Sequence, residues 1–300
     1  MTQIVVAGGF NFTDTQKQRL QAVGAVRETT DFDSAASWLQ QVQGADIICG
    51  DGDYLLENLP NLHDVFVTYP YIELGEFNAK ELEQNGVQVA NTRGSNRDAL
   101  VEWTMYMLLS LFRKFGPLVR VAESQPFART ESLQQKKVLI VGKGNIGSQV
   151  GVLCEAFGMQ VDYFVRGGDL HAQSADADVI INCLNVNATS KNLLDESFFM
   201  GLKPGSYYVS FVRHYTYDID GVIKSLENNI LAGAAIDCDP EPLFDTTNAF
   251  YQKCLTNEKI LVTPHVAAMT TLSGANAMET IVQNVEAFAA GKPQNILTKE

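Results

Sequence analysis

Short apolar runs alternate with helical patterns along the chain from Lys137 onward. The runs are rich in valine and isoleucine, and the stretches between them place apolar residues at helical spacing. This alternation is typical of a parallel sheet whose strands are joined by crossover helices. It predicts a doubly wound sheet with strands over residues 138–141, 161–165, 179–184, 207–211, 232–236 and 260–262.

Apolar periodicity also predicts three helices. The helix after the strand at 138–141 should end at Gly158 and lie on the sheet through Ile146, Val150, Leu153 and Phe157. The uncharged run 103–112 is much shorter than the roughly 20 residues that cross a bilayer, so it predicts a buried helix. A further apolar helical face runs from Leu272 to Phe288 and stops near Gly291.

The first ninety residues repeat the α/β pattern on a smaller scale. Strand-like segments at 4–7, 45–49, 65–68 and 87–90 are separated by polar helical stretches. Farther along the chain, the polar segment 123–135 is the part of the sequence that most resembles a linker. The expected fold class is therefore α/β, with two Rossmann/flavodoxin-like domains. One is a doubly wound parallel sheet and the other a smaller α/β domain.

The composition is consistent with two domains and limits the classes of partner that are expected. A chain of 300 residues is long enough for two domains. Its five cysteines show no paired spacing, which favours reduced thiols and a cytoplasmic location. We expect no metal site. The formal net charge of -13 would repel nucleic acid and anionic membranes, so neither is an expected partner.

A glycine-rich turn lies between the strand at 138–141 and the helix after it. Gly142-Lys143-Gly144-Asn145-Ile146-Gly147 has the Gly-x-Gly-x-x-Gly spacing in the strand–turn–helix context that dinucleotide-binding sites require. The first glycine permits the tight turn, the second lets the backbone approach a pyrophosphate, and the third lets helix and strand pack closely. We expect a dinucleotide at this helix N-terminus.

The end of the next strand favours NADP, with NAD as the other candidate. NAD sites usually place an acidic residue there for the ribose hydroxyls. Here the strand ends in Val165 and Arg166, and Asp162 lies inside the strand. Arg166 is suited to a 2'-phosphate, which a carboxylate would repel.

Three further strands end in residues that suit carbonyl reduction. Arg213, Glu241 and His265 each follow a predicted strand, and the carboxyl ends of such strands border the ligand crevice. Together they supply a clamp for a carboxylate, a proton donor, and a negative group that raises the pKa of that donor.

With these motifs in order, the chain resembles the D-isomer-specific 2-hydroxyacid dehydrogenase family over nearly its whole length. The matching stretches lie at 86–94, 99–103, 141–147, 177–184 with Thr189, 202–205, 232–237 and 263–265. The resemblance implies a substrate domain of residues 1–96 and 270–300, and a cofactor domain of residues 97–269. It also implies a homodimer formed through the cofactor domain.

The resemblance further implies the role of each site residue. Arg213 would bind the carboxylate of a small 2-oxo acid, His265 would donate the proton, and Glu241 would hold His265 protonated. The substrate loop would be Tyr69-Pro70-Tyr71-Ile72. The cofactor would contact the glycine turn, Arg166, Leu184, Thr189 and Asp237.

Two departures from the family pattern leave alternatives open. His214 stands where the family usually has glycine, and one residue is missing between Asp237 and Glu241, so Asp239 is the alternative partner for His265. The segment 167–178 is short, which suggests that an element after the second strand is abbreviated. A dinucleotide-sensing regulatory protein, or a dehydrogenase for another substrate such as formate or phosphite, are the competing functions.

Overall fold

The chain folds into two compact α/β units. A computed structural model describes residues 1–72, 78–115, 129–240 and 244–297. One unit comprises Met1–Asn96 with Thr271–Glu300, and the other comprises Arg97–Thr270. Each is described by itself below, as unit 1 and unit 2.

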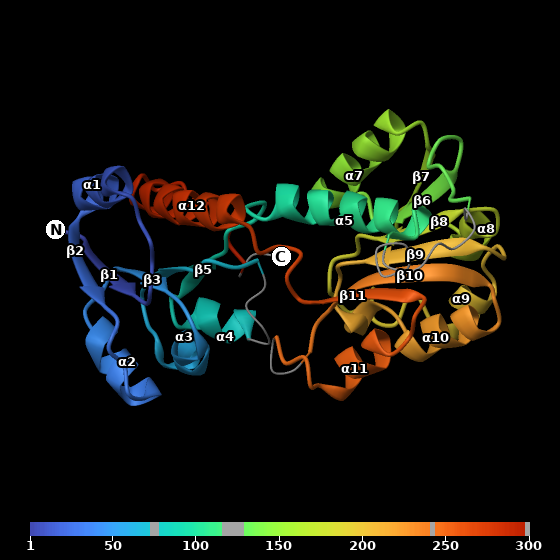
Figure 1. Ribbon diagram of the computed structural model, residues 1–300. Coiled ribbons are helices and arrows are strands. Elements are labelled where there is room, and N and C mark those ends of the chain that lie inside the picture. The colour runs from blue at the N-terminus through green and yellow to red at the C-terminus, as the bar shows by residue number, and fades with distance from the viewer. Residues whose placement is uncertain (73–77, 116–128, 241–243, 298–300) are drawn as a thin grey trace, which may run out of the picture. The chain divides into compact units, whose positions relative to one another are not determined.

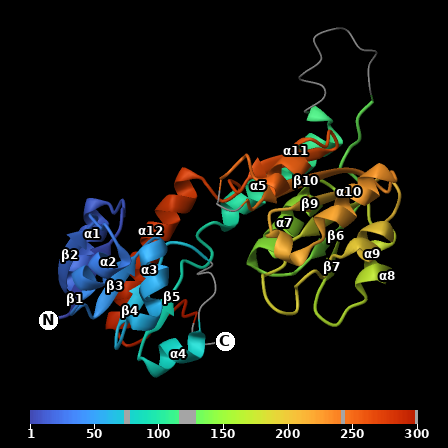
Figure 2. The same cartoon turned by 90° about the horizontal axis from the view of Figure 1, so that it is seen from below.

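Unit 1 is built on a five-stranded parallel sheet in the order β2-β1-β3-β4-β5. Its strands are β1 (Gln3–Ala7), β2 (Ala25–Thr29), β3 (Ile47–Gly50), β4 (Phe66–Thr68) and β5 (Gln88–Ala90). Helices α1 (Asp14–Val23) and α12 (Thr271–Ala289) cover one face (Figure 1). The other face carries α2 (Ala35–Val42), α3 (Asp53–Asn58), η1 (Leu59–Asn61) and α4 (Ala79–Gln84), which Figure 2 shows from below.

Both faces of this sheet are buried, which explains its uninterrupted apolar strands. In β1, Ile4 and Val6 pack under α1 and α12, while Val5 and Ala7 pack under the opposite helices. The edge strand β2, which the apolar pattern did not predict, has no such burial. Its sequence Ala-Val-Arg-Glu-Thr leaves Arg27 and Glu28 exposed, so it carries no core signal.

Unit 2 is built on a six-stranded parallel sheet in the order β11-β10-β9-β8-β6-β7. Its strands are β6 (Lys137–Val141), β7 (Gln160–Phe164), β8 (Val179–Asn182), β9 (Ser206–Ser210), β10 (Leu231–Cys238) and β11 (Ile260–Pro264). Helices α5 (Arg97–Phe112) and α7 (Asn145–Ala156) cover one face (Figure 1). The other carries α8 (Leu170–Ser174), α9 (Glu196–Met200), α10 (Ile219–Glu227) and α11 (Ala249–Leu255).

The strand order places a topological switch between β6 and β8. From β6 the chain moves outward to β7, then crosses back to β8 on the other side of β6. A crevice opens at the carboxyl ends of the strands at such a point, and ligands bind there. The connection from β7 to β8 contains only the five-residue helix α8, which agrees with the short segment noted in the sequence.

The predicted helix face on α7 is correct except at its end. Val150 is fully buried, but Phe157 caps the helix and is 45% exposed. Gly158 follows with a positive φ of 77° and ends the helix as expected. In the part of the chain that the structure describes, no helix is both long enough and apolar enough to span a membrane.

Candidate active site

The glycine turn after β6 leaves the amino end of α7 open. Gly142 has a φ of 109°, and a Cβ there would lie 2.6 Å from the carbonyl oxygen of Cys183. A Cβ on Gly147 would lie 2.1 Å from the carbonyl oxygen of Gly142, so only glycine lets α7 pack this close to the turn. Gly144 begins the helix without a side-chain cap, and nothing lies within 4 Å of its Cβ position. Within the described residues no side chain caps the first N–H groups of α7, which leaves these donors available to an anion.

The other residues of the turn are accessible. Lys143 and Asn145 are exposed, and Ile146 is half-buried. The Lys143 Nζ atom lies 4.4 Å from the centre of the Tyr163 ring, a cation–π contact that holds this ammonium group over β7. The arrangement fits a dinucleotide pyrophosphate on the turn.

Arg166 and Thr189, predicted separately as cofactor contacts, lie side by side. Arg166 follows β7 and donates through an NH2 group to Thr189 Oγ1 at 3.0 Å. The Thr189 hydroxyl and backbone N–H in turn donate to Asn187 Oδ1 at 2.7 and 3.0 Å. The described residues 165–168 that follow β7 include no acid, and Asp162 lies within the strand and accepts from the Tyr163 N–H at 2.8 Å.

A buried amide ties the ends of β8 and β9 together. Asn182, which is fully buried, lies with its Nδ2 within 3.0 to 3.3 Å of the hydroxyls of Tyr208, Ser210 and Thr216. Its Oδ1 accepts from the N–H of Leu184, a predicted cofactor contact, at 3.2 Å. Thr216 also donates to the carbonyl of Arg213 at 3.0 Å, so this network positions the turn that carries Arg213.

Arg213 and His214 begin the turn after β9. Arg213 is half-buried and precedes the short helix η2 (His214–Thr216). Asp239, which is 5% exposed, accepts from the backbone N–H of His214 at 3.1 Å and contacts its Nδ1 at 2.9 Å through the same oxygen. The His214 ring lies 4.8 Å from the Phe250 ring. Asp239 thus holds the residue next to Arg213.

His265 lies in a turn that Asp237 organises from β10. The Oδ1 atom of Asp237 accepts from the Thr263 hydroxyl at 2.5 Å and the Val266 N–H at 3.0 Å, and its Oδ2 accepts from the Ala267 N–H at 2.9 Å. Burial raises the pKa of the Asp237 carboxyl, and these three donors oppose the rise. His265 itself has a φ of 58°, and within the described residues its buried Nδ1 has no hydrogen-bond partner.

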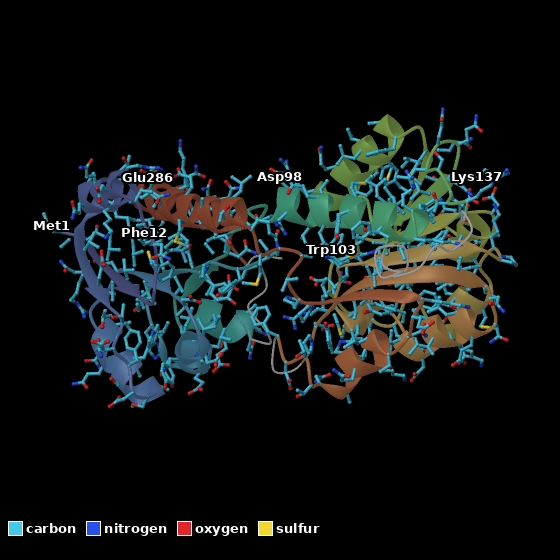
Figure 3. All side chains as sticks on the ribbon, in the orientation of Figure 1. Met1, Phe12, Asp98, Trp103, Lys137 and Glu286 are labelled. Atoms are coloured by element: carbon cyan, nitrogen blue, oxygen red, sulfur yellow. The ribbon has the colours of Figure 1, made fainter. Side chains whose placement is uncertain are left out.

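The Thr263 hydroxyl links this turn to α5. It accepts a hydrogen bond of 3.2 Å from the indole nitrogen of Trp103, which Figure 3 labels on that helix. Asp237, predicted as a cofactor contact, therefore uses both of its oxygens to position the His265 turn. Glu241, the first candidate to pair with His265, lies outside the described residues.

In unit 1, the predicted substrate loop follows β4 at the carboxyl edge of the sheet. Tyr69 is buried and Tyr71 is 55% exposed, with their ring centres 5.2 Å apart in an edge arrangement. The Asn91 amide donates to the carbonyl of Ile72 at 2.7 Å, and the Thr92 N–H donates to that of Tyr71 at 3.2 Å. Residues that follow β5 thus fix the loop up to Ile72.

Comparison with known proteins agrees with this geometry. Residues 105–267 match the family model described as "D-isomer specific 2-hydroxyacid dehydrogenase, NAD binding domain". The chain belongs to the D-isomer specific 2-hydroxyacid dehydrogenase family. The resemblance inferred from the motifs is therefore confirmed, as is the α/β fold class.

Relatives in this family differ in how much of their length the chain spans. A glyoxylate reductase of Thermococcus litoralis is 24% identical over 274 residues, which are 82% of this chain and 80% of that protein. D-3-phosphoglycerate dehydrogenase 2 of Saccharomyces cerevisiae is 28% identical over 222 residues, or 66% of this chain and 47% of that protein. The chain thus spans less than half of the phosphoglycerate dehydrogenase.

Solved structures share the fold over the whole chain. An acyclic imino acid reductase in complex with NADPH and D-Arg superposes with a TM-score of 0.83 at 18% identity, covering 99% of this chain and 100% of that one. A D-2-hydroxyisocaproate dehydrogenase superposes with a TM-score of 0.80 at 19% identity, with the same coverage.

Several residues that position the site were not found from the sequence. Asn182, Asn91 and His214 act through contacts with segments distant in the chain, which no local pattern reveals.

Proposed function

We propose that this protein is an NADP-preferring oxidoreductase of the cytoplasm that interconverts a small 2-oxo acid and the corresponding D-2-hydroxy acid. One observation carries the proposal. The open glycine turn, Arg213 and the His265 turn all lie at the carboxyl edge of the six-stranded sheet, each at the end of a different strand. Because the chain belongs to the D-isomer specific 2-hydroxyacid dehydrogenase family, we interpret this arrangement as a site for the reduction of a 2-oxo acid.

The cofactor would lie along the switch between β6 and β8. The N–H groups at the start of α7 would bind the pyrophosphate, with Gly144 allowing close approach and Leu184 bordering the cofactor. When bound, a reduced nicotinamide supplies the hydride that the 2-oxo carbon accepts. The protein's own contribution is orientation and electrostatics.

Arg213 and His265 would act on the substrate. The planar guanidinium of Arg213 is suited to grip a carboxylate and to polarise the neighbouring 2-oxo group. His265 would give its proton to the oxygen during reduction and take it back during oxidation. The backbone of Tyr69-Pro70-Tyr71-Ile72 would assist in holding the carboxylate.

We assign the carboxylate partner of His265 to Glu241 and not to Asp239. Asp239, the alternative candidate, contacts the backbone N–H and the ring of His214 through one carboxylate oxygen. These contacts with another histidine support the assignment to Glu241. Glu241→Gln should therefore lower kcat for reduction by more than Asp239→Asn does, with NADPH affinity retained in both. The opposite result would transfer the role to Asp239.

The cofactor preference rests on Arg166. Its contact with Thr189 holds the guanidinium at the end of β7, where a 2'-phosphate would lie, and the described residues 165–168 offer no acid for a ribose hydroxyl. Titration of NADPH and NADH should show tighter NADPH binding in the wild type and loss of that preference in Arg166→Ala. Arg113→Ala is a matched control, because Arg113 is also exposed and donates to a threonine hydroxyl, that of Thr130, at 3.0 Å. Equal affinities in the wild type would contradict the preference.

Oxidation of NADPH across glyoxylate, pyruvate, hydroxypyruvate and bulkier 2-oxo acids tests the activity directly. Turnover of at least one of them, with loss in His265→Gln and retained NADPH binding, is the expected result. Binding of NADPH without turnover of any 2-oxo acid would favour a dinucleotide sensor. Activity confined to formate or phosphite would favour a different dehydrogenase.

The oligomer and the location belong to the same proposal. Helix α5 is mostly buried but exposes 57% of Tyr106, which suits a homodimer contact through the cofactor unit. Light scattering should show a dimer that Tyr106→Glu weakens. The five cysteines are free, which suits a reducing cytoplasm and can be tested by cell fractionation.

A further inference from the structure

A fully buried amide stands between the cofactor turn and the substrate arginine of unit 2. Asn182 is the last residue of β8, and it is paired with Val141 of β6 on one side and with Ser210 of β9 on the other. Val141 directly precedes the glycine turn, and Ser210 closely precedes Arg213. A buried polar side chain must be satisfied by its neighbours, so the contacts of Asn182 show what it holds in place.

The two ends of the Asn182 amide face different kinds of partner. Its Oδ1 accepts from the backbone N–H of Leu184 at 3.2 Å. Its Nδ2 lies 3.0 Å from the hydroxyl of Thr216 and 3.2 Å from that of Ser210, and the Tyr208 hydroxyl is farther away at 3.3 Å. The Leu184 N–H can only donate, so the amide oxygen must face it and the amide nitrogen must face the hydroxyls.

The two nearer hydroxyls use their own protons on the backbone around Arg213. The Thr216 hydroxyl donates to the carbonyl of Arg213 at 3.0 Å, and the Ser210 hydroxyl donates to that of Val212 at 3.2 Å. A hydroxyl has one proton, so each of these two oxygens is left to accept, and the amide nitrogen of Asn182 carries two N–H groups. The amide therefore sets the direction of both hydrogen bonds, which fix the backbone on either side of Arg213.

We propose that Asn182 is the positioning residue that sets Arg213 relative to the cofactor, and that it acts as a hydrogen-bond donor. This inference rests on the proposed function. Hydride transfer needs the 2-oxo carbon of the substrate at a fixed place against the nicotinamide. Leu184 borders the cofactor and Arg213 holds the substrate, and one buried side chain is hydrogen-bonded to Leu184 directly and to Arg213 through Thr216.

A purely structural role is the competing explanation. A satisfied buried amide stabilises a fold, and its loss costs stability wherever it lies. Asn58 of unit 1 is a matched example, because it is 4% exposed and its Nδ2 donates to the carbonyls of Ala35 and Tyr54 at 2.9 Å. If Asn182 served only stability, folded Asn182→Asp would keep wild-type kinetics, as folded Asn58→Asp should.

Asn182→Asp separates the two ends of the amide. The carboxylate keeps an oxygen for the Leu184 N–H, so the Kd for NADPH should stay within about 2-fold of the wild type. It has no N–H group, so the two hydroxyls must turn their protons toward it and release the backbone on either side of Arg213. Even a protonated carboxyl offers one O–H group to two hydroxyls.

The experiment measures kcat/KM for the 2-oxo acid that the wild type reduces fastest, with Arg213 present and in Arg213→Ala. A displacement of about 1 Å can cost about 100-fold, and Asp239 still holds the turn at His214, so Asn182→Asp should lower kcat/KM by about 10- to 100-fold. In Arg213→Ala it should change kcat/KM by less than about 2-fold, because a residue that acts through Arg213 has nothing left to position.

Thr216→Val tests the same path and decides the matter if Asn182→Asp does not fold. It removes the hydroxyl that donates to the Arg213 carbonyl, and loss of one such bond should lower kcat/KM by about 2- to 10-fold, again only when Arg213 is present. Thr104→Val is the matched control that should keep wild-type kinetics, because Thr104 is also buried and its hydroxyl donates to the carbonyl of Leu100 at 2.7 Å within α5.

Wild-type kcat/KM in the folded variants would overturn the role of Asn182 and leave the proposed function standing. Losses that multiply with that of Arg213→Ala would do the same, since they would not pass through the arginine. An equal loss of NADPH affinity in Asn182→Asp would indicate a general disturbance of unit 2 and would also overturn it. Failure of the wild type to reduce any 2-oxo acid would overturn both proposals.

Discussion

Two glycines of the same turn should respond to alanine in different ways. In Gly147→Ala the new Cβ would lie 2.1 Å from the Gly142 oxygen and 3.3 Å from the Cys183 Cβ. Favourable non-bonded contacts begin at about 3.5 Å, so the start of α7 must retreat by about 1.4 Å. Both neighbours belong to the backbone or the buried core, so neither can move aside cheaply.

The retreat of α7 should lower both the stability of unit 2 and its affinity for NADPH. Because the short contact is with the backbone, we place the overpacking cost in the upper part of its usual range, about 2–3 kcal/mol, and the higher helix propensity of alanine returns about 1 kcal/mol of it. Unit 2 should therefore lose about 1–2 kcal/mol and unfold at a temperature lower by about 2–8 °C. The helix N–H groups would move away from the phosphates, and loss of one hydrogen bond to a charged group raises the Kd for NADPH about 10- to 100-fold.

Gly144→Ala is the matched variant. Its Cβ meets nothing within 4 Å and its φ of -85° is allowed for alanine, so the free energy of unfolding should change by no more than about 1 kcal/mol. The methyl group would stand where the pyrophosphate approaches the backbone, so NADPH binding should still weaken.

Thermal unfolding and a fluorescence titration with NADPH measure both effects on the same samples. The expected pattern is loss of stability and affinity in Gly147→Ala, and loss of affinity alone in Gly144→Ala. Wild-type affinity in Gly144→Ala would refute the placement of the pyrophosphate. A wild-type unfolding temperature in Gly147→Ala would refute the packing argument.

Three further variants test other parts of the molecule. Arg213→Ala should lower kcat by about 10²- to 10³-fold and leave NADPH affinity unchanged, because the lost donor acts on the substrate; near-normal turnover in the folded variant would remove Arg213 from the mechanism. Asp237→Asn should destabilise unit 2 by about 1–3 kcal/mol in urea unfolding and lower turnover, since one buried donor loses its acceptor; an unchanged midpoint would contradict this. Arg19 joins α1 to Glu279 and Glu286 of α12, the latter labelled in Figure 3, and its hydrogen bonds lower the pKa of both carboxyls. Their contribution to stability is therefore present above the usual carboxyl pKa and lost as pH falls through the lowered values, so Arg19→Gln should be less stable than the wild type at neutral pH, by about 1 kcal/mol or less per pair after solvent screening, and equal to it in acid; a difference that persists in acid would show that packing, and not charge, is lost.

Local pattern in the sequence was enough to predict most of the fold. Strands buried on both faces must be apolar throughout, so β1, β6 and β8 stand out against polar surroundings. The turn at Gly142–Gly147 is also local, because its three constraints fall within six residues and each excludes a side chain. The edge strand β2 escaped prediction because an exposed edge needs no apolar signal.

Contacts between distant segments were decided only by the tertiary structure. The sequence predicts Asp237 as a cofactor contact, and only the fold shows that both of its oxygens accept hydrogen bonds from the His265 turn. The sequence leaves Asp239 as an alternative partner of His265, and only the fold shows its contacts with His214. A side chain's partners depend on the register of neighbouring strands and on the turn after each. Sequence spacing therefore shows which residues reach the carboxyl edge of a sheet, and only packing determines which of them bond to one another.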